Sequence, residues 1–358
     1  MGLFNATKQK PMAAAGGTAN NLQQIGDYYI YTQGELFHRA MSVPAYARAL
    51  GLISSVIGTM KLCMYNEVWN NVEKEMQPVY IAPRSWIRRI NPATTNNFML
   101  SWTVADLFTY GRAFWFISSR DATGYPNAFS RLPAWMITST DQVQNIWFSK
   151  ANNLFFNGVP IDPNDVVQFL NGNEGIVYAS SKTLGTAIKI EEARFRNALS
   201  AIPAGILQVQ ANSESMSQED LQELAATFND ARMSNTIAAL SPEVHYQELM
   251  TSPDKMLLID SATFSAQELS RACGIPAYLL NLSVGSYAYT NSVEARQDLW
   301  TFACKQIAEC ISQTLSMNQV LPNGTFVEFD VQDFIDGDKL KDGDYATNDD
   351  MADVTSPS

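Results

Sequence analysis

The sequence predicts an α+β fold made of more than one compact part. Apolar residues recur at helical spacing in several separate stretches, and short apolar runs bounded by Gly, Pro, Asn and Asp lie between them. The chain has 358 residues, more than one typical domain needs, and 46% of them are hydrophobic while 17% are charged. This composition excludes a disordered or fibrous protein.

The first two parts are an arm and an α+β domain. Residues 1–40 are rich in Ala, Gly, Asn and Gln, and we expect an N-terminal arm that becomes ordered only against a partner. The domain that follows, 41–178, begins with an amphipathic helix over 43–60. The turn Asn91-Pro-Ala-Thr-Thr caps a second helix over 98–110, which Gly111 ends. Its strands are predicted at residues 61–65, 112–119, 132–138, 145–149 and 154–156.

Two long helices enclose a smaller α/β segment. The first, 181–199, stops before Pro203 and carries Glu192 and Arg196 at a spacing that favours an ion pair. The second begins at Ser252-Pro253 and ends at Cys273, because Gly274-Ile-Pro276 cannot continue a helix. Between them we expect strands at 205–210, 236–240 and 244–249, and a helix over 217–232 with Asp220 in its capping box.

The last part contains one more long helix and a strand. A loop covers 281–290, and Asn291 with Glu294 caps the helix that follows. Along that helix an apolar residue recurs every four positions, from Leu299 to Leu315. A strand over 325–331 precedes the acidic C-terminal tail.

The charge is concentrated at the C-terminus. The chain carries 24 Lys and Arg against 36 Asp and Glu, a net charge of −12. Ten acidic residues and two Lys lie from Glu328 onward, so the preceding residues carry a net charge of only −4. A protein that grips nucleic acid normally has a basic patch and a high pI, and this composition argues against such a grip.

No enzyme or metal motif is present in the sequence. His38 and His245 lie far apart and outside any catalytic pattern, and no phosphate-binding loop, nucleophile elbow or dinucleotide fingerprint occurs. The four cysteines form no CxxC pair, so we expect reduced, mostly buried thiols. The acidic run 336–344 lacks the ligand spacing of an EF-hand loop. We therefore expect no catalysis, no cofactor and no metal site, and no segment is apolar enough to span a membrane.

Several motifs occur in one order along the chain. Local matches include Gly2-Leu-Phe, Arg120-Asp-x-x-Gly124 followed by Arg131-Leu-Pro133, and Asp165-Val-Val. The most specific are Pro203-Ala-Gly-Ile-Leu207, Glu268-Leu-Ser-Arg-Ala-Cys-Gly-Ile-Pro-Ala-Tyr-Leu-Leu280 and Asn291-Ser-Val-Glu294. In this order the set resembles the HK97-like family of tailed-phage portal proteins. The sequence departs from the family at Gln168, where His is usual, and at Cys273 and Ala277, which replace Phe and Pro.

The resemblance implies a portal-type subunit with an α/β wing, a two-helix stem, a small α/β clip, a tunnel loop and a helical crown. The arm would be 1–40, the wing 41–178, the stem helices 179–200 and 251–280, the clip 201–250, the tunnel loop 281–290, the helix towards the crown 291–318, and the crown strand with acidic tail 319–358. At 1.5 Å per residue, the 19-residue helix 181–199 spans about 28 Å, which suits the wall of a stem.

The resemblance also implies partners and sites. A homo-oligomeric ring of twelve subunits would sit at one capsid vertex of the virion after assembly in the host cytoplasm, with double-stranded DNA passing through its channel. Its partners would be the large terminase, a head–tail connector or adaptor, and the major capsid and scaffolding proteins, with no membrane. The loop facing DNA would be Val284, Gly285, Ser286, Tyr287, Ala288, Tyr289 and Thr290, and the docking residues of the clip would be Ser213, Glu214, Glu219 and Asp220.

Other interpretations stay open from the sequence. An uncharged loop suits DNA that slides, because Lys and Arg contacts to phosphates would hold it. The same loop can be an ordinary surface loop, and Asp220 can serve only as a helix cap. For the whole chain, the alternatives are an acidic soluble hydrolase whose carboxylate pair meets only in the fold, or another structural protein of the head or neck.

Overall fold

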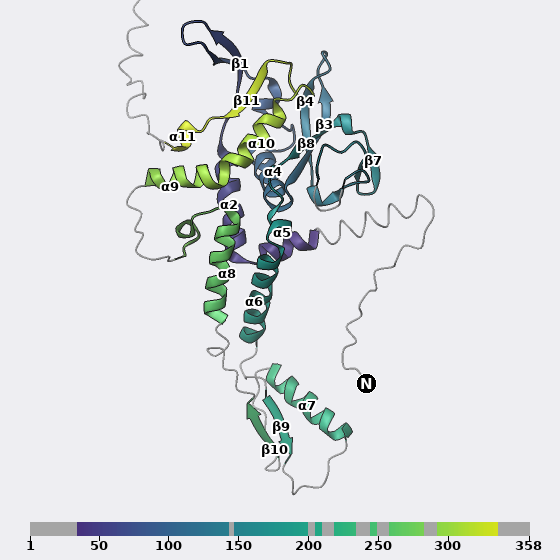
Figure 1. Cartoon of the computed structure of the whole chain (residues 1–358). Helices are drawn as coiled ribbons and strands as arrows, with labels where there is room; N and C mark the ends of the chain where they lie inside the picture. Colours follow the sequence, from purple (N-terminus) through teal and green to yellow (C-terminus); the bar gives the residue numbers. More distant parts are fainter. Residues whose placement is uncertain are drawn as a thin grey trace, which may run out of the picture. The chain divides into compact units, whose positions relative to one another are not determined.

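The computed structural model describes residues 34–142, 147–199, 205–209, 218–233, 244–248, 258–282 and 292–335. These residues divide into two compact units (Figure 1). Unit 1 takes its described residues from Met1–His38, Leu50–Ala179 and Tyr289–Ser358. Unit 2 takes them from Arg39–Ala49 and Ser180–Ala288. The predicted arm 1–40 is thus partly helical, since Gly34–Met41 forms a helix in which Phe37 and Ala40 are buried.

Unit 1 contains three antiparallel three-stranded sheets. Their strand orders are β11-β1-β2, β4-β3-β8 and β5-β6-β7. The strands are β1 Leu62–Asn70, β2 Glu75–Ile81, β3 Arg112–Arg120, β4 Pro126–Leu132, β5 Ile137–Ser139, β6 Leu154–Phe156, β7 Val159–Ile161, β8 Val166–Leu170 and β11 Thr325–Phe329. The helices are α2 Pro44–Thr59 (whose first residues belong to unit 2), α3 Ser85–Arg88, α4 Asn96–Tyr110, α5 Ile176–Ala179, α9 Ser292–Leu299, α10 Lys305–Leu315 and α11 Gln332–Ile335, with short 3-10 turns at Ala134–Met136 and Pro163–Asp165.

The core of unit 1 lies between α4 and the central strand β3. Trp115 of β3 is fully buried and packs against Phe129 and Phe169, with ring centroids 5.4 and 4.9 Å apart. Its indole N–H donates a 2.7 Å hydrogen bond to Thr103 Oγ1 on α4, which in turn donates to the Met99 carbonyl. Trp115 is therefore a core residue, and the one polar atom of its side chain has a partner.

The ends of α4 form as its sequence predicts. Thr95 caps the N-terminus by accepting a 3.1 Å hydrogen bond from the Phe98 N–H. At the other end Gly111 has a φ of 74°, a left-handed conformation in which glycine avoids a steric cost. Its backbone packs closely against the segment that leads into α5. In that segment Gly175 lies so close to the backbone of Thr109 and Tyr110 that a Cβ atom on residue 175 would collide with it. Two glycines thus allow the chain to turn tightly into β3 while α5 packs against the end of α4.

The sheet that contains β1 differs from its prediction. The strand expected over 61–65 extends to Asn70 and turns back as β2, with Trp69 opposite Met76 and Tyr65 opposite Tyr80. This hairpin was not predicted, because its turn lacks an Asn-Gly or Asp-Gly pair and Pro78 interrupts the second run. Since β2 is an edge strand, proline is tolerated there. The strand predicted at 325–331 is confirmed as β11, which pairs with β1.

Two other strand predictions are wrong. Residues 132–138 are the end of β4, a 3-10 turn and the start of β5, because Pro133 lacks an N–H and ends the ladder. Residues 147–149 form no strand, while 145–146 lie outside the described residues. Here the Gln142 side chain pairs with this segment instead, accepting from the Phe148 N–H and donating to Ser149 Oγ.

The departure at Gln168 has a structural explanation. Gln168 lies on β8 and is buried, with both ends of its amide paired to one residue. Its Oε1 accepts from the Ala151 N–H and its Nε2 donates to the Ala151 carbonyl, each at 2.9 Å. Because glutamine carries both a donor and an acceptor, it satisfies this buried backbone segment completely.

The last long helix contains a π-turn. α9 continues through the π-turn Trp300–Cys304 into α10, and the residues predicted to face the core, from Leu299 to Leu315, are buried. A repeat of exactly four residues drifts around an α-helix, which has 3.6 residues per turn. The π-turn takes up more residues per turn, so it helps to keep the repeat on the buried side.

Unit 2 contains the predicted pair of long helices and an α/β segment. α6 Ser181–Leu199 has the predicted bounds, and α8 Leu258–Cys273 ends where predicted, its first residues 252–257 lying outside the described part. β9 Gly205–Val209 pairs antiparallel with β10 Val244–Glu248, and α7 Gln218–Met233 lies between them in sequence. The strand expected at 236–240 lies outside the described residues. So do residues 336–358, which include most of the predicted acidic tail.

The compact units divide the chain differently from the ranges expected from sequence. β11 pairs with β1, and α10 packs against β8 and β11, so residues after 291 share unit 1 with most of 41–178.

All four cysteines are free, and Cys273 and Cys304 are buried. In the part of the chain that the structure covers, no single helix has the length and apolarity of a membrane span, although the bent pair Gly34–Met41 and Pro44–Thr59 passes on length and composition together.

Candidate functional site

The antiparallel pair α6 and α8 is the most extended element of unit 2 (Figure 1). Leu269 and Ser270 of α8 and Leu184 and Ala187 of α6 are buried. Several large apolar side chains on the same helices are exposed, however: Phe195 on α6, and Ile259 and Phe264 on α8, are 62% to 74% exposed. Exposed aromatic and aliphatic residues on a long helix are typical of an interaction surface.

An open groove of about 700 Å³ runs along these two helices. Small residues, among them Ser261, Ser265 and Thr186, make up part of its lining. Its full lining is Lys182, Thr183, Thr186, Ile190, Asp260, Ser261, Phe264, Ser265 and Glu268. The mixture of apolar and polar side chains fits the binding of a protein surface better than that of a small metabolite.

The groove contains no recognisable catalytic set. The hydroxyl of Ser265 is buried and has no hydrogen-bond partner among the described residues, and no histidine lines the groove to activate it. Asp260 and Glu268 are the carboxylates of the lining. Glu268 forms an ion pair with Arg271 one turn along α8.

Charges along α6 pair within the helix. Lys189 contacts Glu192 at 2.7 Å and Arg194 contacts Glu191 at 2.8 Å. The hydrogen bond from Lys189 lowers the pKa of Glu192. The predicted side-chain pair of Glu192 with Arg196 is not formed, because Lys189 takes the carboxylate and Arg196 donates to the Glu192 backbone carbonyl instead.

The C-terminus of α8 leads to the predicted tunnel loop. Gly274 has a φ of 66°, the Ile275 N–H donates to the Ser270 carbonyl, and Ser270 Oγ donates 2.6 Å to the Ile275 carbonyl. A 3-10 turn, Ala277–Leu280, then ends at Asn281, which is also left-handed. The motif Gly274-Ile-Pro276 thus terminates the helix as predicted. Residues 284–290, the candidate loop itself, lie outside the described residues.

The candidate docking residues divide in the same way. Ser213 and Glu214 lie outside the described residues, while Glu219 and Asp220 lie in the first turn of α7. Both side chains are exposed. Carboxylates in the first turn of a helix stabilise it by interacting with the helix macrodipole, so the position of Glu219 and Asp220 fits a helix-stabilising role as well as docking.

His245 lies on β10 and pairs with Gln208 of β9 in the strand register.

One carboxyl group of unit 1 has a strongly shifted pKa. Burial raises the pKa of Asp106 to about 7, and the neighbouring Arg131 opposes this shift. Arg131 Nε and Nη2 donate 3.0 and 2.9 Å hydrogen bonds to the two carboxylate oxygens. The guanidinium also lies over Trp102 and Trp135, 4.7 and 5.3 Å from the ring centroids. Because Asp106 is 2% exposed, this group has no access to a substrate and its role is structural.

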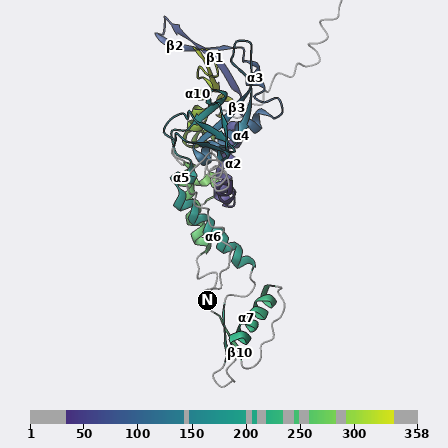
Figure 2. The same ribbon diagram turned by 90° about the vertical axis from the view of Figure 1, so that its right-hand side faces the viewer.

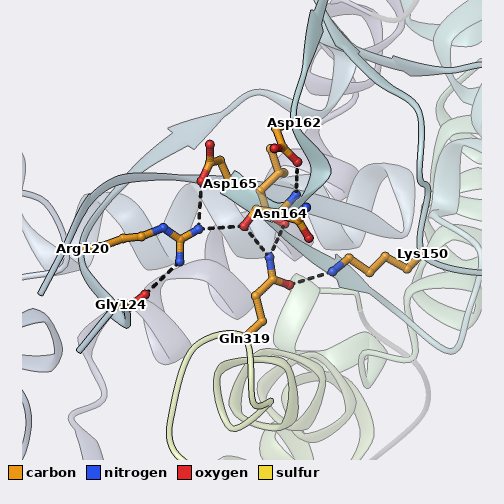
Figure 3. Close-up of polar contacts among 8 residues, drawn as sticks. Arg120, Gly124, Lys150, Asp162, Asn164, Asp165 and Gln319 are labelled. Carbon is orange, nitrogen blue, oxygen red and sulfur yellow. Dashed lines mark hydrogen bonds and ion pairs between the residues drawn. The ribbon is translucent and has the colours of Figure 1, made fainter. Parts of the chain in front are cut away.

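The motif Arg120-Asp-x-x-Gly124 also has a structural role, seen in Figure 3. Arg120 donates to the Gly124 and Asn164 carbonyls and to Asp165, at 3.2, 2.9 and 2.8 Å. Gln319, which follows α10, donates to the same Asn164 carbonyl and accepts 2.7 Å from Lys150. This network joins the end of β3, the turn before β8 and the turn that follows α10, all within unit 1.

Sequence reasoning missed both the groove and the exposed hairpin β1–β2. Ile259 and Phe264 lie off the buried stripe of Ser265, Leu269 and Cys273 on α8, and these apolar residues outside the stripe were the available signal. Within the described ranges, no group of three or more His, Cys, Asp or Glu side chains is arranged to hold a metal ion.

The sequence model of the family described as phage portal protein matches residues 44–348. The chain belongs to the phage portal protein family. The match includes residues of both compact units, so the family covers α6 and α8 as well as the sheets of unit 1.

The fold agrees with solved structures of this kind. An HK97-family phage portal protein from Corynebacterium diphtheriae has a TM-score of 0.64 and 21% identity, covering 83% of this chain and 96% of that one. A chain in the virion of a native gene transfer agent particle has a TM-score of 0.55 at 15% identity, covering 91% and 93%. A chain in the neck of a native gene transfer agent particle, computed with C12 symmetry, has a TM-score of 0.51 at 14% identity, covering 82% of each.

Sequence relatives are less extensive. Uncharacterised proteins of Rickettsia felis and Rickettsia bellii are 27% and 28% identical over 136 and 120 residues. The matched regions are 36% and 32% of this chain, and 35% and 31% of those proteins. The chain therefore matches only about a third of the length of these relatives.

Proposed function

We propose that this chain is the subunit of a portal ring at one vertex of a phage capsid, where it forms the channel for DNA packaging and ejection. The observation that carries this proposal is membership of the phage portal protein family over residues 44–348. A similar chain in a neck computed with C12 symmetry supports twelve subunits. The role is structural, with no catalysis or cofactor of its own, and the product is part of the virion after assembly in the host cytoplasm.

The first test is assembly of the purified full chain. We expect native mass spectrometry and negative-stain microscopy to find a closed ring of twelve times the 39.7 kDa subunit mass. A monomer or dimer under all assembly conditions would contradict the proposal.

Within the ring, α6 and α8 would form the stem, and the segment between them the clip. The exposed Phe195, Ile259 and Phe264 support this assignment, because a ring would cover apolar helix surface that an isolated subunit leaves in water. The wing would be 41–178, and 291–318 would lead towards the crown.

Residues 284–290 would face the DNA. They contain no charged side chain and two tyrosines, so they would contact DNA without the salt-dependent hold that several Lys or Arg residues add. Replacing 284–289 by a short Gly-Ser linker should leave the ring intact but impair packaging or retention of DNA. Packaged DNA per particle, measured by nuclease protection, is the readout, and unchanged phage yield would refute this role.

The clip would dock the large terminase and later the head–tail connector through Ser213, Glu214, Glu219 and Asp220. The exposure of Glu219 and Asp220 at the start of α7 supports this proposal. The double variant Glu219→Lys/Asp220→Lys should assemble normally and fail to bind terminase in a pull-down from packaging extract. Ala225→Lys, which adds a charge at another exposed position of α7, is the control. Terminase binding by the double variant at the unmodified level would contradict the docking role.

A further inference from the structure

The β1–β2 hairpin exposes large apolar side chains on both of its faces. β11 pairs with β1 only from Leu62 to Asn66. Beyond Asn66 the hairpin is a ribbon of the two strands β1 and β2 alone (Figure 1). A ribbon of this kind is marginally stable in water unless something covers it. The exposed side chains, 48% to 89% accessible, are Val68, Trp69, Val72, Met76, Val79 and Tyr80.

One face of this ribbon is both aromatic and acidic. Cross-strand pairing places Glu67, Trp69, Met76, Pro78 and Tyr80 on the same face, which we call the acidic aromatic face. Tyr80 donates a 2.5 Å hydrogen bond to Glu328 of β11, whose carboxylate therefore belongs to this face too. Within the described part of the chain Glu67 has no ion-pair partner.

A surface of opposite charge lies elsewhere on unit 1. Arg88, Arg89, Pro92 and Phe98 are all exposed, and we call this surface the basic corner. Asn96 Nδ2 donates to the Ile87 and Arg88 carbonyls, which fixes α3 against the start of α4. Arg84 pairs with Asp121 at 2.9 Å, but Arg88 and Arg89 have no carboxylate partner among the residues described. In Figure 2 the hairpin and α3 both lie in the upper part of this unit, β2 to the left and α3 to the right.

We propose that the acidic aromatic face of one subunit docks on the basic corner of the neighbouring copy of this chain. This rests on the proposed ring, because a closed ring of identical subunits is heterologous and needs two different patches that complement each other on opposite sides of each subunit. The two surfaces share no residue, are both exposed and are opposite in charge, which is the complementarity that such a contact needs.

The chemistry of the two surfaces also favours this occupant. Arg, Trp, Tyr and Met are enriched in protein interfaces, and a guanidinium can both pair with a carboxylate and stack on an indole. Arg88 and Arg89 could therefore satisfy Glu67 and Glu328 while covering Trp69. Phe98 and Pro92 supply apolar surface for Met76. An isolated subunit would leave all of these groups in water.

Three variants of the full chain test the contact by native mass spectrometry and sedimentation. Trp69→Ser/Met76→Ser removes the apolar centre of the acidic aromatic face. Glu67→Arg reverses its charge. Glu67→Arg/Arg88→Glu exchanges one charge between the two sides and leaves Glu328 and Arg89 unchanged. We expect the first two to weaken association at each subunit contact by at least about tenfold, so that folded monomers accumulate, and the third to restore the ring.

The control is Val68→Ser/Val79→Ser, which alters equally exposed positions on the opposite face of the hairpin. Far-UV circular dichroism confirms that each variant is folded. A Phe98→Cys/Trp69→Cys variant adds a second measurement, since a short bismaleimide should join subunits into a ladder only if the surfaces meet.

The outcomes separate the two proposals. If the unmodified chain forms no ring, the proposed function fails. If it forms a ring and the acidic aromatic face variants also form rings at the unmodified level, only the docking proposal is overturned. Failure of the charge-exchange variant to restore the ring would also overturn the docking proposal. So would rings of the acidic aromatic face variants that assemble normally but do not join a capsid shell, because the hairpin would then bind another partner.

Discussion

Arg131 combines two kinds of contact in the core of unit 1. It holds Asp106 through two hydrogen bonds and lies between Trp102 and Trp135, and Phe37 packs against both tryptophans with centroids 6.1 and 5.9 Å away. The planar guanidinium suits this site because it can pair in a bidentate manner and stack at the same time.

We expect Arg131→Lys to lower the free energy of unfolding by about 3 kcal/mol, because lysine cannot make the bidentate pair and leaves part of a buried carboxylate uncompensated. Urea denaturation followed by tryptophan fluorescence measures this loss. The control Lys189→Ala removes an exposed ion pair and should cost less than about 1 kcal/mol. Equal losses in the two variants would contradict the special role of Arg131.

The pH dependence of stability tests Asp106 separately. Burial raises its pKa to about 7 in the folded protein, whereas an aspartate in an unfolded chain titrates near about 4. Between these values the folded state holds a proton that the unfolded chain has released, so this group favours folding less as the pH rises.

We therefore expect the wild type to lose stability relative to Asp106→Asn as the pH rises from about 4 to about 7. Urea midpoints of both proteins, measured at several pH values, give the difference. A wild type that instead gains stability over the variant in this window would mean that the ion pair with Arg131 outweighs burial and lowers the pKa.

Among the helices, two glycines differ in whether a larger residue could replace them. A side chain at Gly175 would collide with the backbone of Thr109 and Tyr110, where α5 packs against the end of α4. Gly185 lies within α6 with nothing within 4 Å of an added Cβ. One position requires glycine and the other only tolerates it.

Gly175→Ala should destabilise the protein by more than about 2 kcal/mol, since backbone has to shift to admit the methyl group. Gly185→Ala should stabilise it by about 0.5–1 kcal/mol, because alanine loses less conformational entropy in a helix. Thermal unfolding by circular dichroism distinguishes the signs. A stabilising Gly175→Ala would show that the close approach is not required.

Elements with local signals were predictable, and those that depend on distant partners were not. Thr95, Gly111 and Gly274 end or begin helices through their own backbone and side-chain geometry, so α4 and the end of α8 were predicted from the sequence. The hairpin β1–β2 depends on β11, some 250 residues away, and on edge exposure that tolerates Pro78. The sequence alone therefore indicated only the strand over 61–65 and not the hairpin.

The candidate site divides along the same line. The bounds of α6 and the end of α8 follow from their own sequence patterns. The groove depends on which small residues face one another across the pair, Thr186 on one helix and Ser261 and Ser265 on the other, and a single chain pattern does not specify that meeting. The exposed Phe264 becomes informative only once Leu269 and Cys273 are seen to form the buried stripe.

For the whole molecule, the division into two compact units has a thermodynamic consequence. Each unit has buried apolar residues of its own, such as Trp115 in unit 1 and Leu269 in unit 2. Proteins built in this way commonly unfold in more than one step. We expect two transitions in scanning calorimetry of the subunit.

Substitutions should then act on one transition each. Arg131→Lys should lower the temperature of one transition, and Gly185→Ala should raise that of the other, because the residues belong to different units. A single transition that both variants shift would show that the units unfold as one.

The number of residues in the π-turn Trp300–Cys304 determines the rotation of α9 about the helix axis relative to α10. Each residue of an α-helix advances the chain by about 100° around the axis. Removing one residue from this turn would convert it to ordinary α-helix, and everything before it would rotate about the axis by a comparable angle. The extra residue therefore determines which side chains of α9 face the rest of unit 1. A one-residue deletion would turn a different face of α9 towards its neighbours while leaving both helices intact.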